Sequence, residues 1–344
     1  MTIDTSGRNV PWSPTLEEVA ALAGVSSSTA SRVINGSPRV TEETIARVNA
    51  AIAKVGYVPN RAARNLASRR TQNVAMVIPE QTAEFFADPY FAEVIQGAAM
   101  HASSSDYFLS LLIESEHEPH RTRQFLRRGN VDGALVLSHH SASSSYRDLA
   151  RTLPVVFGVR PPGEYGDAVH VVDVDNVAAG ALGTQHLIDR GRRRIATITG
   201  PLSTSAGRDR MQGWSDAIAA AGLATGAQEE GDYTPSGGAA AARRLLDADG
   251  SFDAVFIASA QMASGALTVF NERGLRVPVD VAVSTVDNNV FSTSSTPRLT
   301  TVDVHTSEKG ATMMATIIRL ISGEQVPAET RVPIDLIVRE STVL

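Results

Sequence analysis

The stretch at residues 15–68 carries the most constraining structural pattern in this chain. Thr15 and Glu18 have the T-x-x-E spacing of a capping box, which marks a helix start, and apolar residues then recur at helical spacing up to Ala23. Gly24 interrupts this pattern, and a second helix is predicted over residues 27–35. Two short helices joined by a glycine-containing turn predict a helix-turn-helix unit, whose second helix enters the major groove of DNA.

A third helix is expected to complete this unit. Thr41 is placed to cap its first turn, and Gly56 is placed to end it. Its apolar surface is expected to consist of Ala46, Val48, Ala50 and Ile52. Three short helices with small apolar residues also occur in many other globular domains, so the helical pattern alone leaves the function open.

The series of residues through this region is more specific than the pattern. In order along the chain, it consists of Gly-Val-Ser at 24–26, Thr29, Ser-Arg-Val at 31–33, Asn35, Gly-Tyr-Val-Pro-Asn at 56–60 and Ala-Arg-x-Leu-Ala at 63–67, and the spacing needs no insertion or deletion. The series resembles the head and hinge of the LacI/GalR transcription repressors. The resemblance implies a helix-turn-helix head at 14–59, a hinge helix at 60–71 and an effector-binding and dimerisation domain at 72–344. The polar segment at 1–13 is expected to be disordered.

Side-chain chemistry divides the predicted DNA contacts of the head into two groups. Arginine suits the O6 and N7 atoms of guanine and serine is permissive, so base reading in the major groove is predicted for Ser27, Ser28 and Arg32. Contacts that fix orientation on the phosphates are predicted for Thr15, Ser26, Thr29, Ser31 and Asn35.

The hinge is basic and short. One or two helical turns are not stable alone in water, so this segment is expected to fold only when it is held on DNA. Asn60, which can cap the hinge helix, Ala63 and Leu66 are its predicted DNA-binding residues. Leu66 can pack against the head, or, as the resemblance implies, it can pry apart a central base step from the minor groove.

Charge is distributed unevenly along the 344 residues. The net charge is −6, but residues 1–70 hold nine Arg or Lys and five Asp or Glu, which leaves +4 on the head and hinge and −10 on the rest. A basic head on an acidic body suits local contact with phosphates. The chain has no cysteine, no apolar signal-peptide core and no membrane-length apolar stretch, so a cytoplasmic protein without metal or cofactor is expected.

The remaining chain alternates apolar runs of strand length with helix candidates. The runs are at 74–79, 108–115, 133–138, 155–159, 171–174, 195–200, 254–259 and 281–287, and helices are expected at 90–104, 121–128 and 146–152 among others. Continuous apolar strands alternating with helices predict parallel sheets covered on both faces. The fold class is therefore α/β, with an all-α head followed by two doubly wound parallel-sheet subdomains.

The body resembles the periplasmic-binding-protein fold of LacI/GalR effector domains. That resemblance implies two subdomains, joined by three crossovers near residues 172, 305 and 333, with the ligand between them. The first subdomain is predicted at 72–172 and 306–332, and the second at 173–305 and 333–344.

Ligands of open α/β sheets lie beyond the carboxyl ends of the strands, and this position gives the predicted effector-binding residues. Phe86, Tyr90, His139, Asp175, Asn176, Ser259 and Asp287 are at this position. The resemblance implies Arg210 in addition, because the family often has an arginine there that binds the effector. Several alternatives remain: helix capping for Asp175 and Asn176, a surface position for Arg210, a core role for the aromatic residues and simple solvation for His139. The family often has Asn-Asp where this chain has Ser259-Ala260, and Gly-Tyr where it has Thr285-Val286, so its ligand or the way the ligand is held is expected to differ.

These patterns predict a sequence-specific DNA-binding regulator. It is expected to be a homodimer on palindromic operator DNA and to repress carbohydrate-utilisation genes until a small sugar, such as a plant-polysaccharide oligosaccharide, releases it. The alternative is a sugar-binding protein or a sugar-modifying α/β enzyme with no role on DNA. The chain lacks the nucleotide-binding, metalloprotease and nucleophile-elbow motifs that would support an enzyme.

Overall fold

The structure is a computed structural model that describes residues 14–34, 36–57, 70–78, 87–113, 119–137, 146, 148–161, 169–248 and 251–343. The chain forms two compact units, Met1–Arg70 and Thr71–Leu344. The segment at 1–13 and most of the predicted hinge lie outside the described residues. So do six predicted site residues, namely Asn35, Asn60, Ala63, Leu66, Phe86 and His139.

The described part of the first unit is the predicted three-helix head. It contains α1 (Leu16–Ala23), α2 (Ser27–Ile34) and α3 (Glu42–Val55). The capping box at Thr15 and Glu18 is formed, since each side chain accepts a hydrogen bond from the other residue's backbone nitrogen. Thr41 caps α3, and Gly56 ends that helix in a left-handed conformation with φ of 68°.

One part of the head prediction is wrong, because Ala46 and Ala50 are exposed on α3. The residues of α3 buried in the head core are Val48 and Ala51, which pack with Val19, Ala20, Ala23 and Ala30. A helix turns once every 3.6 residues, so the alternate spacing of 46, 48 and 50 cannot lie on one face.

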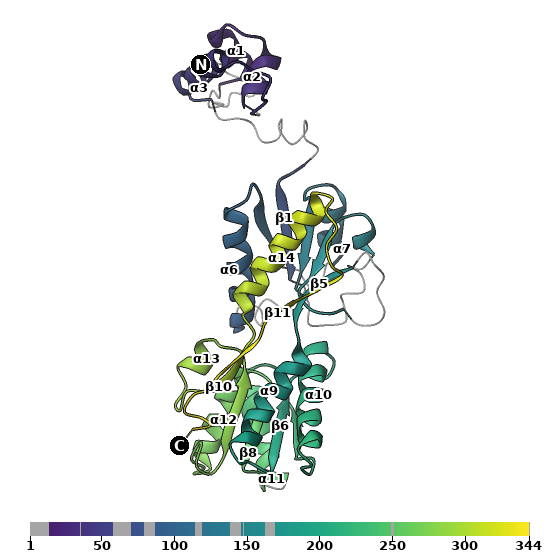
Figure 1. Ribbon diagram of the computed structural model, residues 1–344, viewed down its shortest axis with the longest axis vertical. Coiled ribbons are helices and arrows are strands. Elements are labelled where there is room, and N and C mark those ends of the chain that lie inside the picture. The colour runs from purple at the N-terminus through teal and green to yellow at the C-terminus, as the bar shows by residue number, and fades with distance from the viewer. Residues whose placement is uncertain are drawn as a thin grey trace, which may run out of the picture. The chain divides into compact units, whose positions relative to one another are not determined.

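The first sheet of the second unit is parallel throughout, with the strand order β11-β5-β4-β3-β1-β2. Figure 1 labels three strands of this sheet, β1, β5 and β11. Its strands are β1 (Asn73–Ile78), β2 (Phe108–Ile113), β3 (Gly133–Val136), β4 (Val155–Phe157), β5 (His170–Val174) and β11 (Glu329–Val332). With these strands lie α6 (Pro89–Ser103), α7 (Pro119–Arg127), α14 (Thr306–Ile321) and the 3-10 turn η2 (Leu149–Arg151). We call this part the first lobe. Within the helix predicted at 146–152, Tyr146 is helical and residues 149–151 form the 3-10 turn η2.

The second sheet has the order β12-β10-β9-β8-β6-β7, in which only β12 is antiparallel to its neighbour. Its strands are β6 (Ile195–Thr199), β7 (Gln228–Glu230), β8 (Ala254–Ile257), β9 (Ala282–Val286), β10 (Thr300–Asp303) and β12 (Asp335–Ile337). Its helices are α9 (Asn176–Asp189), α10 (Ser205–Ala220), α11 (Pro235–Ala248), α12 (Ala260–Glu272) and α13 (Val290–Thr293). We call this part the second lobe. The two sheets confirm the predicted α/β class.

The chain passes between the lobes three times: from β5 to α9, from β10 to α14, and from β11 to β12. In the first lobe, α6 and α14 pack backbone against backbone, since a Cβ added to Gly97 would lie 1.7 Å from the carbonyl oxygen of Ser307. In the second lobe, α9 and α10 do the same at Gly180, where an added Cβ would lie 2.1 Å from the carbonyl oxygen of Arg210. Among the described helices, none has the length and apolar character needed to cross a membrane.

Candidate effector site and DNA-binding face

A cavity of about 590 Å³, including its open mouth, lies among the ends of the strands where the lobes meet. Both lobes supply polar side chains to its wall, which is lined by Asp88, Tyr90, Asp173, Asn176, Arg210, Tyr233, Ser259, Gln261, Asp287, Thr306 and Lys309. Apolar residues of both lobes complete the wall, so the cavity suits a ligand with both polar groups and apolar faces.

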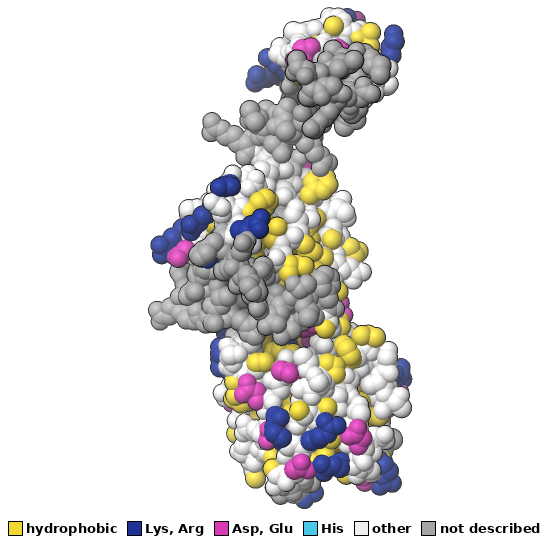
Figure 2. Space-filling model, turned by 180° about the vertical axis from the view of Figure 1, so that it is seen from behind, with side chains coloured by type: hydrophobic (Ala, Val, Ile, Leu, Met, Phe, Trp, Pro, Cys, Tyr) yellow, Lys and Arg dark blue, Asp and Glu magenta, His cyan; other side chains and the backbone are white. Residues whose placement is uncertain are grey.

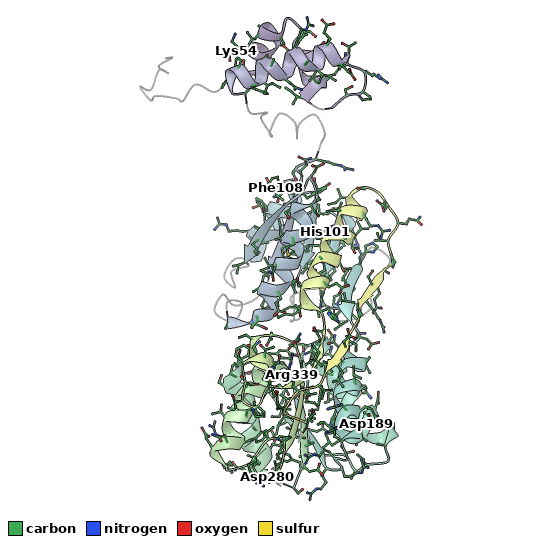
Figure 3. All side chains as sticks on the ribbon, turned by 60° about the vertical axis from the view of Figure 1, so that its left-hand side comes forward. Lys54, His101, Phe108, Asp189, Asp280 and Arg339 are labelled. Carbon is green, nitrogen blue, oxygen red and sulfur yellow. The ribbon has the colours of Figure 1, made fainter. Side chains whose placement is uncertain are left out.

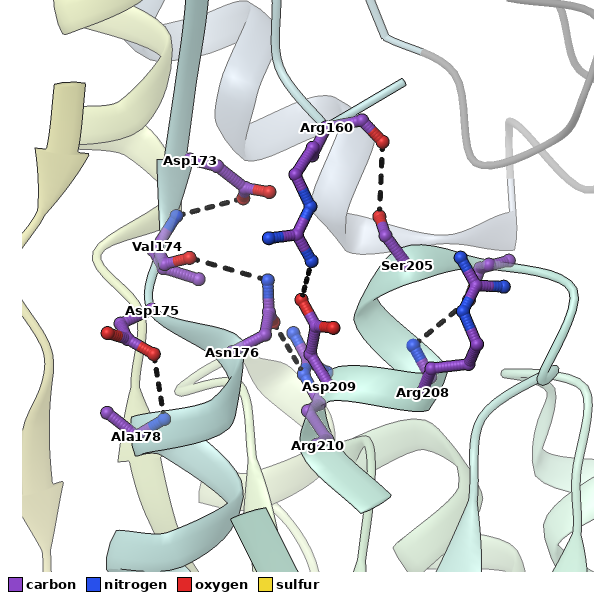
Figure 4. Close-up of polar contacts among 12 residues, drawn as sticks. Arg160, Asp173, Val174, Asp175, Asn176, Ala178, Ser205, Arg208, Asp209 and Arg210 are labelled. Carbon is purple, nitrogen blue, oxygen red and sulfur yellow. Dashed lines mark hydrogen bonds and ion pairs between the residues drawn. The ribbon is translucent and has the colours of Figure 1, made fainter. Parts of the chain in front are cut away.

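Arg210 is buried in the cavity wall and held on two sides. Its Nε donates to Oδ1 of Asn176 at 2.9 Å (Figure 4), and its Nη1 donates to the carbonyl oxygen of Ala258 at 2.6 Å. The close approach of α10 to α9 at Gly180 and Gly213 sets the position of this arginine. Its Nη2 group has no hydrogen-bond partner within the described residues, so it is available to a ligand.

Asp287 follows β9 and faces the same cavity. Its backbone is left-handed, with φ of 80°, and its carboxylate accepts a hydrogen bond from the backbone nitrogen of Ala260 at the start of α12. Burial raises the pKa of Asp287, although the nearby Arg210 partly offsets this effect. A strained non-glycine residue at a cavity is typical of functional sites.

Asp88 and Gln261 connect the two lobes at the cavity. Asp88 caps α6 by accepting from the nitrogen of Tyr90 at 2.9 Å, and Nε2 of Gln261 donates to the same Asp88 oxygen at 2.7 Å. Burial raises the pKa of Asp88 to about 6. Ser259 and Ala260 replace the Asn-Asp that the family often has at this place. The site still contains an amide and a carboxylate, because Gln261 and Asp88 supply them.

A second set of contacts joins the lobes beside the cavity. Arg160, which follows β4, forms an ion pair with Asp209 on α10, and the hydroxyl of Ser205 donates to the carbonyl oxygen of Arg160 at 3.3 Å (Figure 4). Both partners of the ion pair are partly exposed, so its net energy is small, about 0–1 kcal/mol.

The structure brings five of the predicted effector-binding residues together. Tyr90, Asn176, Arg210, Ser259 and Asp287 all line the cavity. Ser259 also caps α12, because its hydroxyl accepts from the nitrogen of Met262 at 3.3 Å.

Asp175 does not line the cavity. Its carboxylate caps α9, by accepting from the nitrogen of Ala178 at 2.9 Å, and it pairs with Arg331 on β11. Helix capping, the alternative that the sequence left open for this residue, describes its contacts.

Sequence reasoning missed several polar residues of the cavity, among them Asp88, Asp173, Gln261, Thr306 and Lys309. Two of them carry a sequence signal. Asp173 interrupts the apolar strand VVDV, and Lys309, one of two lysines in the chain, falls on the apolar side of α14 with Met313 and Ile317. A charged residue at a position whose pattern calls for an apolar one indicates a site.

The head exposes one polar face of α2. Ser27, Ser28 and Arg32 are exposed, whereas Ala30 is buried and faces the head core. Ser26 accepts from the nitrogen of Thr29 at 3.2 Å, and Ser26 and Thr29 share a second hydrogen bond of 2.9 Å between their hydroxyls. The first turn of α2 contains no acidic residue, so its amino-terminal dipole remains available to a phosphate.

A helix-turn-helix head followed by a two-lobed α/β domain with a polar interlobe cavity defines an effector-responsive DNA-binding regulator. Residues 15–60 match the model of bacterial regulatory proteins of the lacI family, and residues 184–342 match that of a periplasmic binding protein-like domain. The chain belongs to the lacI family.

Named relatives agree with this assignment. The chain is 41% identical over 333 residues to the HTH-type transcriptional regulator CelR of Thermobifida fusca, covering 95% of this chain and 98% of that protein. It is also similar to a CelR–cellobiose complex (39% identity, TM-score 0.75, 95% and 99% of the two chains) and to a lac repressor dimer bound to operator and an anti-inducer (26%, 0.82, 97% and 100%). These relatives are regulators, so the prediction of a DNA-binding transcriptional regulator rather than an enzyme is confirmed.

Proposed function

We propose that this regulator represses carbohydrate-utilisation genes and that a small uncharged oligosaccharide, with cellobiose as the first candidate, releases it from its operator. The observation that carries the proposal is the cavity wall, which presents carboxylate, amide, guanidinium and hydroxyl groups from both lobes. Such groups bind sugar hydroxyls, and the named ligand of the CelR complex suggests a two-ring glucose sugar. A protein that acts on chromosomal DNA is expected in the cytoplasm.

The charges of the cavity favour an uncharged ligand. Three carboxylates, those of Asp88, Asp173 and Asp287, face two cations, Arg210 and Lys309. Each cation already has an acceptor, since Arg210 bonds to Asn176 and Lys309 to Asp173. A sugar phosphate or sugar acid would bring further negative charge to this wall, so these ligands are expected to bind less tightly than the neutral sugar.

We further propose that a second copy of the chain covers an apolar face of the first lobe. β2 is an edge strand, and Leu111 and Ile113, which lie on the same side of it, have exposed fractions of 40% and 37%. Together with Ala92 and Ile95 of α6, Leu111 and Ile113 line a groove on this face. Apolar side chains gather on the first lobe in Figure 2. A pair of heads would match two half-sites of a palindrome.

The test is a fluorescence-anisotropy titration of the purified protein with DNA from upstream of its own gene. Operator affinity should fall when cellobiose is added, by about 1–3 kcal/mol of coupling free energy, while glucose 6-phosphate and cellobionate have little effect. Tighter operator binding with cellobiose would make the sugar a co-repressor. No response to any neutral sugar in a mono- and oligosaccharide panel would refute the proposed effector class.

A further inference from the structure

A buried ion pair stands in the first-lobe wall of the cavity. Nζ of Lys309 on α14 donates to Oδ1 of Asp173 on β5 at 2.8 Å. The two residues are only 4% and 7% exposed, although both line the cavity. The lysine ammonium also lies 5.4 Å from the centre of the Tyr90 ring.

Stability does not explain this pair. Removing two charges from water costs several kcal/mol, and replacing a buried ion pair by apolar residues is often neutral or stabilising. The surrounding core of the first lobe is apolar and includes Val94, Met313 and Ile317, so two apolar side chains would suit the same place. The pair therefore points to a use at the cavity surface.

The hydrogen bonds within the pair leave an acceptor oxygen of Asp173 and a donor proton of Lys309 for a ligand in the cavity. Oδ1 of Asp173 accepts from both Lys309 and the backbone nitrogen of Val174, the latter at 2.9 Å. The other oxygen, Oδ2, has no hydrogen-bond partner within the described residues. The ammonium has three protons to donate: its bond to Asp173 uses one, the neighbouring Tyr90 hydroxyl takes a second, and one remains. A free carboxylate oxygen next to an ammonium can accept from one hydroxyl and donate to the neighbouring hydroxyl of a sugar ring.

We propose that Asp173 and Lys309 form a diol-binding pair that holds two adjacent hydroxyls of the effector sugar. This inference rests on the proposed function, a sugar effector in this cavity. The pair supplies a first-lobe contact that complements Arg210, Asn176 and Asp287 of the second lobe. A sugar held at both walls would connect the lobes.

The positions of the pair also connect it to the crossovers between lobes. Asp173 is the penultimate residue of β5, directly before the passage to α9. Lys309 lies in the first turn of α14, directly after the passage from β10. A diol bound to the pair therefore contacts side chains next to two of the three segments that join the lobes, and its binding can alter how these segments are held.

The first experiment measures the binding of cellobiose and its monodeoxy analogues by isothermal titration calorimetry. Loss of one partner leaves a buried unpaired charge that can prevent folding, so the main variant is the double change Asp173→Asn with Lys309→Met. We expect this variant to bind cellobiose at least tenfold more weakly. Wild type should lose affinity for the one or two monodeoxy analogues that lack a hydroxyl bound by the pair. In the double variant this loss of affinity relative to cellobiose should disappear, as in a double-mutant cycle.

Arg276→Met is the matched control, because it also removes one cation from an ion pair. Arg276 pairs with Asp280 at an exposed site, and Asp280 lies at the far end of the second lobe in Figure 3. This variant should bind every analogue as wild type does. Circular dichroism of all variants checks the fold.

The second experiment needs no variant. The chain has only two lysines, Lys54 in the head and Lys309, so lysine labelled with ¹⁵N at Nζ gives two assignable signals. Cellobiose should shift the Lys309 signal and leave that of Lys54 unchanged, and the deoxy analogue that loses most affinity should shift it less.

The possible outcomes separate the two proposals. If wild type binds no sugar, the proposed effector is wrong and the diol-binding pair with it. If wild type binds cellobiose but the Lys309 signal does not move, or the double variant retains the wild-type pattern of deoxy penalties, the pair does not contact the sugar. In that case the proposed function stands and the inference fails.

Discussion

Asp88 is an ionisable side chain at the junction of the lobes, and its environment predicts a pH-dependent stability. Burial raises its pKa from 3.8 to about 6, so the folded protein binds this proton more tightly than the unfolded chain does. Ionisation therefore costs stability progressively as pH rises from 4 to 6, and the cost stays constant above that. Asp88→Asn, which keeps a helix-capping side chain, should raise the free energy of unfolding by about 1–3 kcal/mol at pH 8 and change it little near pH 4.

Urea unfolding of both proteins across this pH range checks the prediction. Asp280→Asn is a control of opposite sign, because the hydrogen bonds from Arg276 lower the pKa of Asp280 to about 2. The ionised Asp280 carboxylate therefore stabilises the folded protein above pH 4, and this stabilisation is lost as pH falls toward 2. Asp280→Asn should accordingly be less stable than wild type at neutral pH. An Asp88→Asn effect that is the same at every pH would mean that Asp88 titrates as in the unfolded chain.

Arg32 is the charged residue on the exposed face of α2, and its removal should change specificity. If Arg32 donates to a guanine, Arg32→Ala should cost about 1–3 kcal/mol on the operator and much less on a scrambled duplex. Lys54→Met removes one positive charge from the same head and should weaken binding to both duplexes alike. Anisotropy with the two duplexes decides between these roles, since an equal loss for Arg32→Ala would make it a phosphate contact.

At the scale of the element, the sequence predicted best those strands that are buried on both faces. β1, β3, β6 and β8 are continuous apolar runs, and their burial follows from position inside a parallel sheet. β7 and β11 have polar sequences, Gln-Glu-Glu and Glu-Thr-Arg-Val, and lie at sheet edges. No hydrophobic pattern marks such strands, because their pairing depends on a sheet built from distant segments.

The same reasoning explains which site residues were predicted. Asp287 ends an apolar strand, so the rule that ligands lie beyond strand ends finds it. Asp173 and Lys309 stand inside regular elements, where periodicity assigns them only to a strand and a helix. Their meeting depends on the tertiary contact of β5 with α14, which the sequence alone does not give.

The contact of α6 with α14 gives a prediction about the element pair. Gly97→Ala would place a methyl group 1.7 Å from the carbonyl oxygen of Ser307, so the helices must separate. Such overpacking should lower the free energy of unfolding by about 1–3 kcal/mol or more. Ala99→Ser, at an exposed position of the same helix, is the control and should cost less than 1 kcal/mol by helix propensity. Equal effects in urea unfolding would contradict backbone contact between these helices.

At the scale of the whole molecule, the apolar face at β2 predicts the state of assembly. Leu111→Lys should keep the fold, because the side chain is 40% exposed on an edge strand, but should place a charge in the proposed dimer contact. Light scattering should then report a monomer, and operator affinity should fall more than tenfold. Val279→Lys, an exposed residue of the second lobe, should remain dimeric. A dimeric Leu111→Lys would place the contact elsewhere.

The three passages between the lobes also have a consequence for how the protein is made. The first lobe needs α14 against α6 and β11 beside β5, and these elements end at residues 321 and 332 of 344. The ribosome therefore delivers strands β1 to β5 long before the segments that complete their sheet and cover it. The head can fold as soon as it emerges, whereas the first lobe must wait, with apolar surface exposed, until α14 and β11 have been synthesised. We expect nascent chains that stop before residue 306 to be captured by chaperones and full-length chains to be released.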